Sequence, residues 1–274
     1  MATLANRSRL FEMLKQRVIT GLIALAVLLV VLFVMPPLTV KVVIAALMLA
    51  GAWEWSGFLK LETTGARIAY VGLIAVLLAA VVGLVDERIV ELVFKAALAW
   101  WLVALLWVFM FPTPIPKTAG WLCGVLVLIP TYVAIISLHT LQPALLLFVL
   151  VLVWAADIGA YFVGKRFGRV KLAPNISPGK TWEGALGGLF LTAVLVLVSS
   201  RWLETDLAVL LPFCLAVAII SIIGDLTVSM FKRNAGVKDS GRLFPGHGGV
   251  LDRIDSVTAA APLFALGANW VGLR

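Results

Sequence analysis

Residues 207–230, LAVLLPFCLAVAIISIIGDLTVSM, form one of the long apolar runs that decide the fold of this chain. About 20 apolar residues in a helix cross the hydrocarbon core of a bilayer. Comparable runs recur from residue 17 onward, and the 274 residues are 62% hydrophobic and 13% charged, whereas soluble domains are about a quarter charged. A soluble helical bundle does not account for this hydropathy. The sequence therefore predicts an all-α, polytopic transmembrane helical bundle.

Turn residues divide the chain into about nine expected spans. The breaks contain Pro, Gly or polar clusters, such as Pro36-Pro37 and Gln142-Pro143. The expected spans are 18–35, 38–59, 68–85, 89–111, 119–139, 143–164, 183–200, 207–230 and 252–272. We expect about five N-terminal spans in residues 1–150, and about four spans with polar loops in residues 151–274.

The basic residues predict the orientation of these spans. With a cytoplasmic N-terminus, 17 of the 22 Lys and Arg residues fall on the cytoplasmic side, which is the positive-inside pattern. Loops 165–182 and 231–251 then face the cytoplasm. The net charge of +8 is mainly a topology determinant, and nucleic acid is not an expected partner. We expect the first apolar run to be retained, because Met35-Pro36-Pro37 follows it in place of a small-residue cleavage site.

A few polar or reactive groups lie within apolar segments. Cys123 and Cys214 fit no metal or redox spacing and are expected to be packing residues. Ionisable residues within spans are costly and by default mark function. Four of those at or inside the expected spans stand out, namely Glu54, Asp157, Glu183 and Asp225. Glu54 lies between two tryptophans, which favours a membrane-interface position, whereas Asp157 either closes a helix–helix hydrogen bond or faces a polar cavity.

The segment Ser177-Pro-Gly-Lys180-Thr181-Trp-Glu183-Gly184 precedes the seventh expected span. It is not a P-loop, because Pro174 stands where that motif requires glycine. We expect Ser177, Lys180 and Thr181 to open a helix whose free N–H groups suit a phosphate. The alternative is a simple helix start, with Ser177 or Thr181 as the cap and Glu183 in the first turn.

The eighth span and the loop after it carry the densest set of polar residues. Ser221, Asp225 and Ser229 are spaced to share one helix face. If the eighth and ninth spans are antiparallel neighbours, Asp225 and Asp252 converge near the inner surface. Carboxylate and hydroxyl oxygens suit Mg²⁺ bound together with substrate phosphates.

Basic residues and glycines in the same stretch predict phosphate binding. Arginines contact phosphate oxygens in pairs and lysines act as point charges, while glycines let the backbone approach a ligand. The basic residues and the loop histidine are Lys232, Arg233, Lys238, Arg242, His247 and Arg253. A salt-bridged loop joining two helices is the alternative. The residues alone thus predict a cytoplasm-facing phosphate site, suited to phosphoryl or nucleotidyl transfer onto a lipid.

The stretch from Ser229 to Asp255, SMFKRNAGVKDSGRLFPGHGGVLDRID, resembles the full signature of the phosphatidate cytidylyltransferases. The segments 157–161 and 177–184 also resemble that family, so the similarity covers the chain from about residue 150. The resemblance implies transfer of the cytidylyl group of CTP to phosphatidate, giving CDP-diacylglycerol and pyrophosphate. It also implies a homodimer in the bacterial inner membrane, with the active site facing the cytoplasm.

The resemblance implies roles for individual residues. Asp225 and Asp252 would hold Mg²⁺, with K⁺ as a second cation, and would act in catalysis with Lys232 and Ser229. The residues expected to bind substrate are Ser177, Lys180, Thr181, Arg233, Lys238, Asp239, Arg242, His247, Arg253 and Asp255. Two other functions compete with this one: a CTP-dependent polyprenol or lipid kinase, and a cation-coupled transporter of an anionic solute. The chain shows no internal repeat of the kind that many transporters contain.

Overall fold

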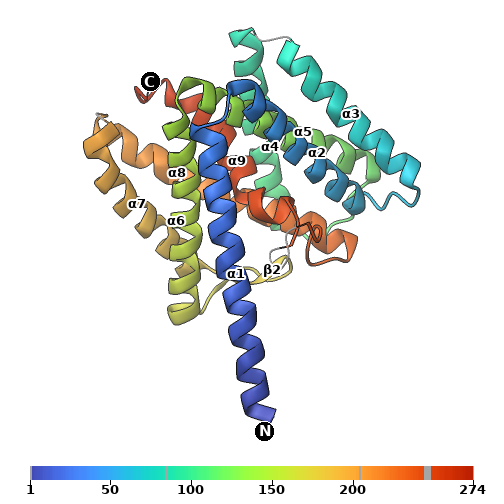
Figure 1. Ribbon diagram of the computed structural model, residues 1–274, viewed down its shortest axis with the longest axis vertical. Coiled ribbons are helices and arrows are strands. Elements are labelled where there is room, and N and C mark those ends of the chain that lie inside the picture. Colours follow the sequence, from blue (N-terminus) through green and yellow to red (C-terminus); the bar gives the residue numbers. More distant parts are fainter. Residues whose placement is uncertain (1, 84–85, 204, 244–247, 274) are drawn as a thin grey trace.

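The computed structural model describes residues 2–83, 86–203, 205–243 and 248–273, without the side chains of residues 2–17, 82, 83 and 203. Over these ranges the chain forms helices joined by short loops, with one β-hairpin (Figure 1). The helices are α1 (Ala2–Phe33), α2 (Pro37–Phe58), α3 (Thr64–Gly83), α4 (Glu87–Met110), α5 (Lys117–Leu141), α6 (Pro143–Phe167), α7 (Trp182–Leu203), α8 (Leu207–Ala235) and α9 (Leu251–Ala268).

The predicted all-α, polytopic fold is confirmed. Helices α2 to α9 begin and end within about five residues of the expected spans, whereas α1 begins at Ala2 and extends beyond the rest of the bundle (Figure 1). Among the residues that the structure describes, seven helices, α2 to α8, are long and apolar enough to cross a membrane. The described apolar part of α1, Val18–Phe33, is shorter. Helix α9 is more polar, because Asp252, Arg253 and Asp255 lie at its start.

Helices α5 and α9 lie in the middle of the bundle. In α5, 67% of the apolar span is buried by other parts of the protein, compared with 17% in α3. Helix α9 contacts α4, α5, α6 and α8. A peripheral helix in a membrane turns its apolar side chains to lipid, whereas a central one packs on protein. The polar start of α9 is therefore surrounded by protein on several sides.

Helices α6 and α7 pack backbone against backbone. A Cβ atom added at Gly188 would lie 2.6 Å from the carbonyl oxygen of Ala156, and one at Gly159 would lie 2.5 Å from the carbonyl oxygen of Gly187. Small residues allow membrane helices to approach this closely, and van der Waals contact then stabilises the pair. The two helices therefore form one tightly joined unit, from whose ends the β-hairpin projects.

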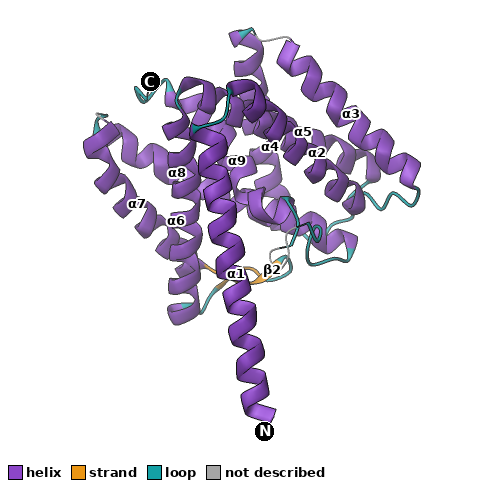
Figure 2. Cartoon of the chain, in the orientation of Figure 1, coloured by secondary structure: helices purple, strands orange, loops and turns teal. Residues whose placement is uncertain are grey.

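The hairpin corrects one prediction. Strands β1 (Lys171–Ala173) and β2 (Ser177–Thr181) pair antiparallel, so Ser177 and Lys180 do not open a helix (Figure 2). Helix α7 begins after them at Trp182. Thr181 does cap that helix, since its Oγ1 accepts a hydrogen bond from the Gly184 N–H at 3.1 Å. A strand has no free helix-end donors, so the expected N-terminal phosphate site is absent at Ser177.

Candidate functional site

Asp225 lies near the cytoplasmic end expected for α8 and is held by two donors. Lys180 Nζ on β2 lies 2.5 Å from Asp225 Oδ2, and the Ser229 hydroxyl donates to Oδ1 at 3.1 Å. The predicted shared face of Asp225 and Ser229 is thus confirmed. Ser221 instead donates to the Ala218 carbonyl of its own helix. Lys180 was expected in the same site as Asp225, but as a substrate-binding residue; its direct contact with the α8 carboxylate, across 45 positions of the chain, was not predicted.

Asp252, at the start of α9, forms a second and more buried pair. Lys232 Nζ donates to its Oδ1 at 2.8 Å, and each side chain is 9% exposed. The backbone N–H groups of Ser240 and Gly249 donate to Oδ2, both at 2.9 Å. Burial by itself raises the pKa of a carboxyl group, but Lys232 and these two amides outweigh it and hold the pKa of Asp252 below its usual value. Asp252 is therefore an ionised, rigidly held carboxylate.

Charges from α6 and α9 complete the cluster around these two pairs. The side chain of Asp157 on α6 is exposed, forms no hydrogen bond with another described residue, and lies within electrostatic range of Asp225, Lys180 and Arg253. The structure therefore gives no support to a helix–helix hydrogen bond at Asp157, and the polar cavity stays a prediction. Asp255 lies in range of Asp225, and burial followed by that neighbouring charge raises the pKa of Asp255 well above its usual value.

Arg233, one of the predicted substrate-binding residues, has structural partners on the hairpin, and so does Glu183 at the start of α7. Arg233 donates from Nε to the Ile176 carbonyl at 3.0 Å and from Nη1 to the Val237 carbonyl at 3.2 Å, which ties the end of α8 to the hairpin. Glu183 accepts hydrogen bonds from the N–H groups of Arg169 and Val170 and so closes the base of the hairpin.

The remaining predicted residues divide into three groups. The exposed charged residues of the loop after α8 and of the start of α9 are Lys238, Asp239, Arg242 and Arg253, and none of them forms an ion pair with another described residue. Ser177 is half-buried on β2. His247 lies outside the described residues. Cys123 and Cys214 are buried and free, as expected of packing residues.

The donor set bears on metal binding. In the described part of the chain, no three His, Cys, Asp or Glu residues converge as a ready metal site. Asp225 and Asp252 are linked through Lys232, which bonds to Asp252 and interacts electrostatically with Asp225. Mg²⁺ is commonly held by one or two carboxylates together with substrate phosphates. Carboxylate and hydroxyl oxygens at Asp225, Ser229 and Asp252 fit that mode. In this structure a lysine ammonium group is paired with each of the two carboxylates.

Glu54 occupies a different environment from the one predicted. It is 8% exposed, and its neighbour Trp55 is fully buried, donating from Nε1 to the Gly120 carbonyl at 3.0 Å. The interpretation of Glu54 as an interface residue between two membrane-belt tryptophans is therefore wrong. The Glu-Trp pair faces the interior because α2 packs on α5 and α8. The alternation of apolar and aromatic residues in α2 gave no sign of which face is inward.

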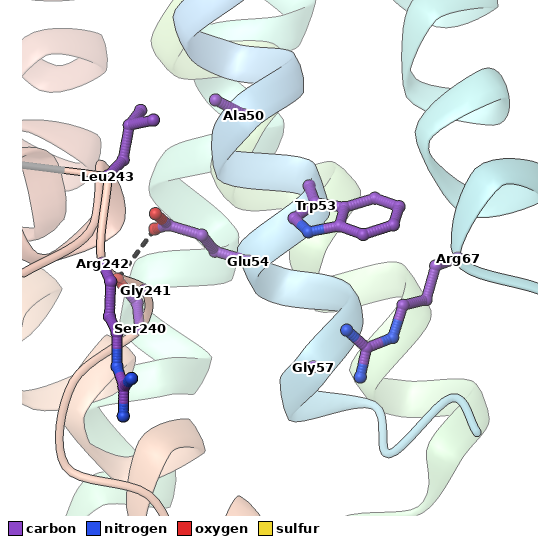
Figure 3. Close-up of a pocket in the computed structure, with 9 residues that line it drawn as sticks. All are labelled: Ala50, Trp53, Glu54, Gly57, Arg67, Ser240, Gly241, Arg242 and Leu243. Atoms are coloured by element: carbon purple, nitrogen blue, oxygen red, sulfur yellow. Dashed lines mark hydrogen bonds between the residues drawn. The ribbon is translucent and has the colours of Figure 1, made fainter. Parts of the chain in front are cut away.

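A cavity of about 550 Å³ adjoins Glu54 (Figure 3). Trp53 and Gly57 of α2, Arg67 of α3, and Ser240 and Arg242 of the loop are among the residues that line it. Figure 3 shows Glu54 pointing from α2 to the loop, whereas Trp53 points towards Arg67. Neither Lys180 nor Asp225 is among the residues that line this cavity.

Comparisons with known proteins agree with one another. Residues 15–270 match the Cytidylyltransferase family. A phosphatidate cytidylyltransferase of Pseudomonas aeruginosa is 44% identical over 270 residues, covering 94% of this chain and 99% of the relative. One of Haemophilus influenzae is 40% identical over 285 residues, covering 92% and 98% respectively. One of Synechocystis is 53% identical over 114 residues, covering 40% of this chain and 38% of the relative.

Proposed function

This chain belongs to the cytidylyltransferase family, and on that premise we propose how its charged cluster performs the reaction. The enzyme transfers the cytidylyl group of CTP to phosphatidate, giving CDP-diacylglycerol and pyrophosphate. A phosphate oxygen of phosphatidate forms a bond to the α-phosphorus of CTP. The bond from that phosphorus to the oxygen bridging the α- and β-phosphates breaks, and pyrophosphate leaves with the electron pair.

The observation that carries the proposal is the pair of carboxylate–lysine contacts, Lys180–Asp225 and Lys232–Asp252, at the polar end of the bundle. Reactions between two phosphates need their negative charges neutralised and their atoms aligned. We propose that Lys180 and Lys232 exchange their carboxylate partners for phosphate oxygens when the substrates bind. Ser229, bonded to Asp225, then lies beside the reacting groups.

Asp225 and Asp252 would hold Mg²⁺ once the lysines have turned to phosphate, with K⁺ as a proposed second cation. The bound cation would neutralise charge on the triphosphate and polarise its phosphoryl groups. The protein's part is to keep both carboxylates ionised and in place. For Asp252 this is done by the Ser240 and Gly249 amides, which bond to Oδ2, whereas Lys232 bonds to Oδ1.

The exposed cations and the surrounding residues are proposed to bind the nucleotide. Arg233, Lys238, Arg242 and Arg253 border the cluster and carry free donors that suit phosphate oxygens. The set proposed to complete the substrate site is Ser177, Thr181, Asp239, His247 and Asp255. Thr181 acts there through the helix cap that positions its neighbour Lys180.

The chain is an integral membrane protein, and we propose that it resides in the bacterial inner membrane as a homodimer. The distribution of Lys and Arg supports an active site that faces the cytoplasm. Exposed apolar residues over α6 and α7, such as Phe162 and Phe190, support contact with lipid or with a second copy.

The decisive experiment supplies CTP labelled at its α-phosphate to the purified enzyme with phosphatidate in mixed micelles. We expect the label to enter the lipid and unlabelled pyrophosphate to be released, in proportion and only with Mg²⁺. In a parallel assay with CTP labelled at its γ-phosphate, label in the lipid would instead indicate a kinase. Solute flux into sealed vesicles without nucleotide turnover would indicate a transporter.

A further inference from the structure

Glu54 of α2 directs all its hydrogen bonds to the segment that precedes and begins α9. Its Oε1 accepts from the Val250 N–H at 2.8 Å, and its Oε2 accepts from the Leu251 N–H at 2.9 Å. Oε2 also accepts from the Ser240 hydroxyl at 2.7 Å (Figure 3). A buried carboxylate is costly unless it is paired or hydrogen-bonded. Within the described ranges Glu54 forms no ion pair, so these three donors stabilise its charge.

Two of these donors belong to the N-terminus of a helix. Leu251 is the first residue of α9, and Val250, at the N-cap position, has no side chain able to accept a hydrogen bond. The first N–H groups of a helix lack partners within the helix and carry partial positive charge. Glu54 provides from another helix the acceptor that an N-cap residue normally provides. It thereby fixes where α9 begins.

The same backbone segments also hold Asp252. Ser240 donates its hydroxyl to Glu54 and its N–H to Asp252 Oδ2. Gly249 donates its N–H to Asp252, and the next N–H, that of Val250, donates to Glu54. The loop is therefore held at two places by two carboxylates at once. The orientation in which Asp252 meets Lys232 depends on the position that Glu54 gives to this loop.

Glycine at position 241 is explained by the same contact. A Cβ atom added there would overlap the Glu54 carboxylate, and its three nearest atoms would all belong to Glu54, with Cδ at 2.8 Å. A Cβ at Gly249 would meet Glu54 Oε1 and the Ser240 hydroxyl. The loop backbone thus approaches Glu54 more closely than any side chain allows. Glu54 and Gly241 form one fitted contact, 187 positions apart in the chain.

We propose that Glu54 is a positioning residue for cytidylyl transfer, which acts by fixing Ser240 and the segment 249–251 so that Asp252 faces Lys232 and the bound substrates. It touches neither substrate. The inference rests on the proposed role of Asp252 in the reaction, and it adds that α2, in the N-terminal half, determines the geometry of a site built from the C-terminal half.

The test combines activity with a direct measurement on the loop. Glu54→Gln keeps the size of the side chain but loses the charge and one acceptor, and we expect its kcat/KM to fall about tenfold. For Glu54→Ala we expect kcat/KM to fall about 100-fold. Losses of about 10- to 100-fold are typical of residues that orient a reactive group through another residue. Hydrogen exchange of the peptide containing residues 249–253 should become faster in Glu54→Gln. Glu62→Gln, an exposed glutamate beyond the same helix, is the matched control and should change neither quantity.

A double-mutant cycle tests the contact itself, including the case in which Glu54→Ala folds poorly. Gly241→Ala alone should reduce activity severely, because its methyl group meets Glu54. In the Glu54→Ala background, Gly241→Ala should lower activity by less than a further twofold or so, because the atoms that obstruct the methyl group are gone. A double variant whose loss of activity equals the product of the two single losses would overturn the inference. So would a Glu54→Gln enzyme with faster exchange and unchanged activity, or one with lowered activity and unchanged exchange.

Asp252→Asn separates this inference from the proposed function. An inactive Asp252→Asn enzyme, together with the expected Glu54–Gly241 coupling measured in the enzyme that retains Asp252, supports both. A fully active Asp252→Asn enzyme overturns the role of Asp252 and positioning through it, whatever the coupling shows. Loss of the coupling while Asp252→Asn is inactive overturns the role of Glu54 alone.

Discussion

Replacing Lys232 by methionine should destabilise the protein more than any exposed charge replacement. The substitution keeps an apolar stem of similar length but removes the ammonium that lies 2.8 Å from Asp252 Oδ1, where each side chain is 9% exposed. Breaking a buried ion pair leaves an uncompensated charge and typically costs about 3–5 kcal/mol. Because the Ser240 and Gly249 amides still bond to Asp252, we expect the lower end, about 3 kcal/mol.

Lys95 provides the matched control. It pairs with Glu91 at the same distance, 2.8 Å, but the two side chains are 59% and 52% exposed. An exposed pair between residues four apart in a helix contributes about 0.5 kcal/mol or less. The contrast between Lys95→Met and Lys232→Met therefore isolates burial as the cause. In the double variant Lys232→Met/Asp252→Asn the unpaired charge is gone, and about 2 kcal/mol should be regained.

The measurement is reversible unfolding in mixed micelles, followed by tryptophan fluorescence. Trp55 is a suitable reporter, since it packs against Phe231 beside Lys232 with ring centroids 4.8 Å apart. Equal losses for Lys232→Met and Lys95→Met would refute the reasoning. An additive loss in the double variant would also refute it, because the two groups would then not be coupled.

Four further predictions follow from the same geometry. Asp225→Asn and Asp252→Asn should each lower label transfer about 100-fold or more while the protein stays folded and membrane-inserted, as checked by size-exclusion chromatography; wild-type rates would remove them from the site. Chelation with EDTA should stop pyrophosphate release, and added Mg²⁺ should restore it; unaffected release would exclude a metal requirement. Gly188→Ala should lower the free energy of unfolding by about 1–3 kcal/mol, because the added methyl group meets the Ala156 carbonyl where α6 and α7 pack. In the same unfolding assay Gly72→Ala, which has open space around it, should be neutral or slightly stabilising. The pKa of Asp252 is lowered in the folded state, so its contribution to the free energy of unfolding should be complete at neutral pH and should decline as pH falls below about 3.9. The stability difference between the wild type and Asp252→Asn should therefore shrink in acid, and a constant difference would contradict this.

Helix positions were predictable because the physical signal is local. A run of apolar residues bounded by turn residues, as at Gln142-Pro143, determines a span without reference to the rest of the chain. The face shared by Asp225 and Ser229 is equally local, since it follows from helical spacing. The family signature then indicated the chemistry of the residues around Asp252.

Partners far apart in sequence were not predictable from the residues. Lys180 and Asp225 are 45 positions apart, and Glu54 and Leu251 are 197 apart. Their contacts depend on which helices become neighbours, and apolar runs of similar composition do not specify this. The hairpin around Ser177 was missed for another reason: its strands are short and lack the alternation of apolar and polar residues that marks a half-buried strand.

The tight α6–α7 pair makes Lys180 a natural reporter of movement inside the membrane. The hairpin is closed at its base by Glu183 and joined at both ends to helices that meet backbone to backbone, so Lys180, close to the start of α7, moves with these helices. Asp225 moves with α8. A shift of α8 relative to α6 and α7 as lipid enters or product leaves would change the separation of two opposite charges. A spectroscopic label on the hairpin would therefore record the turnover cycle as a change in distance to α8.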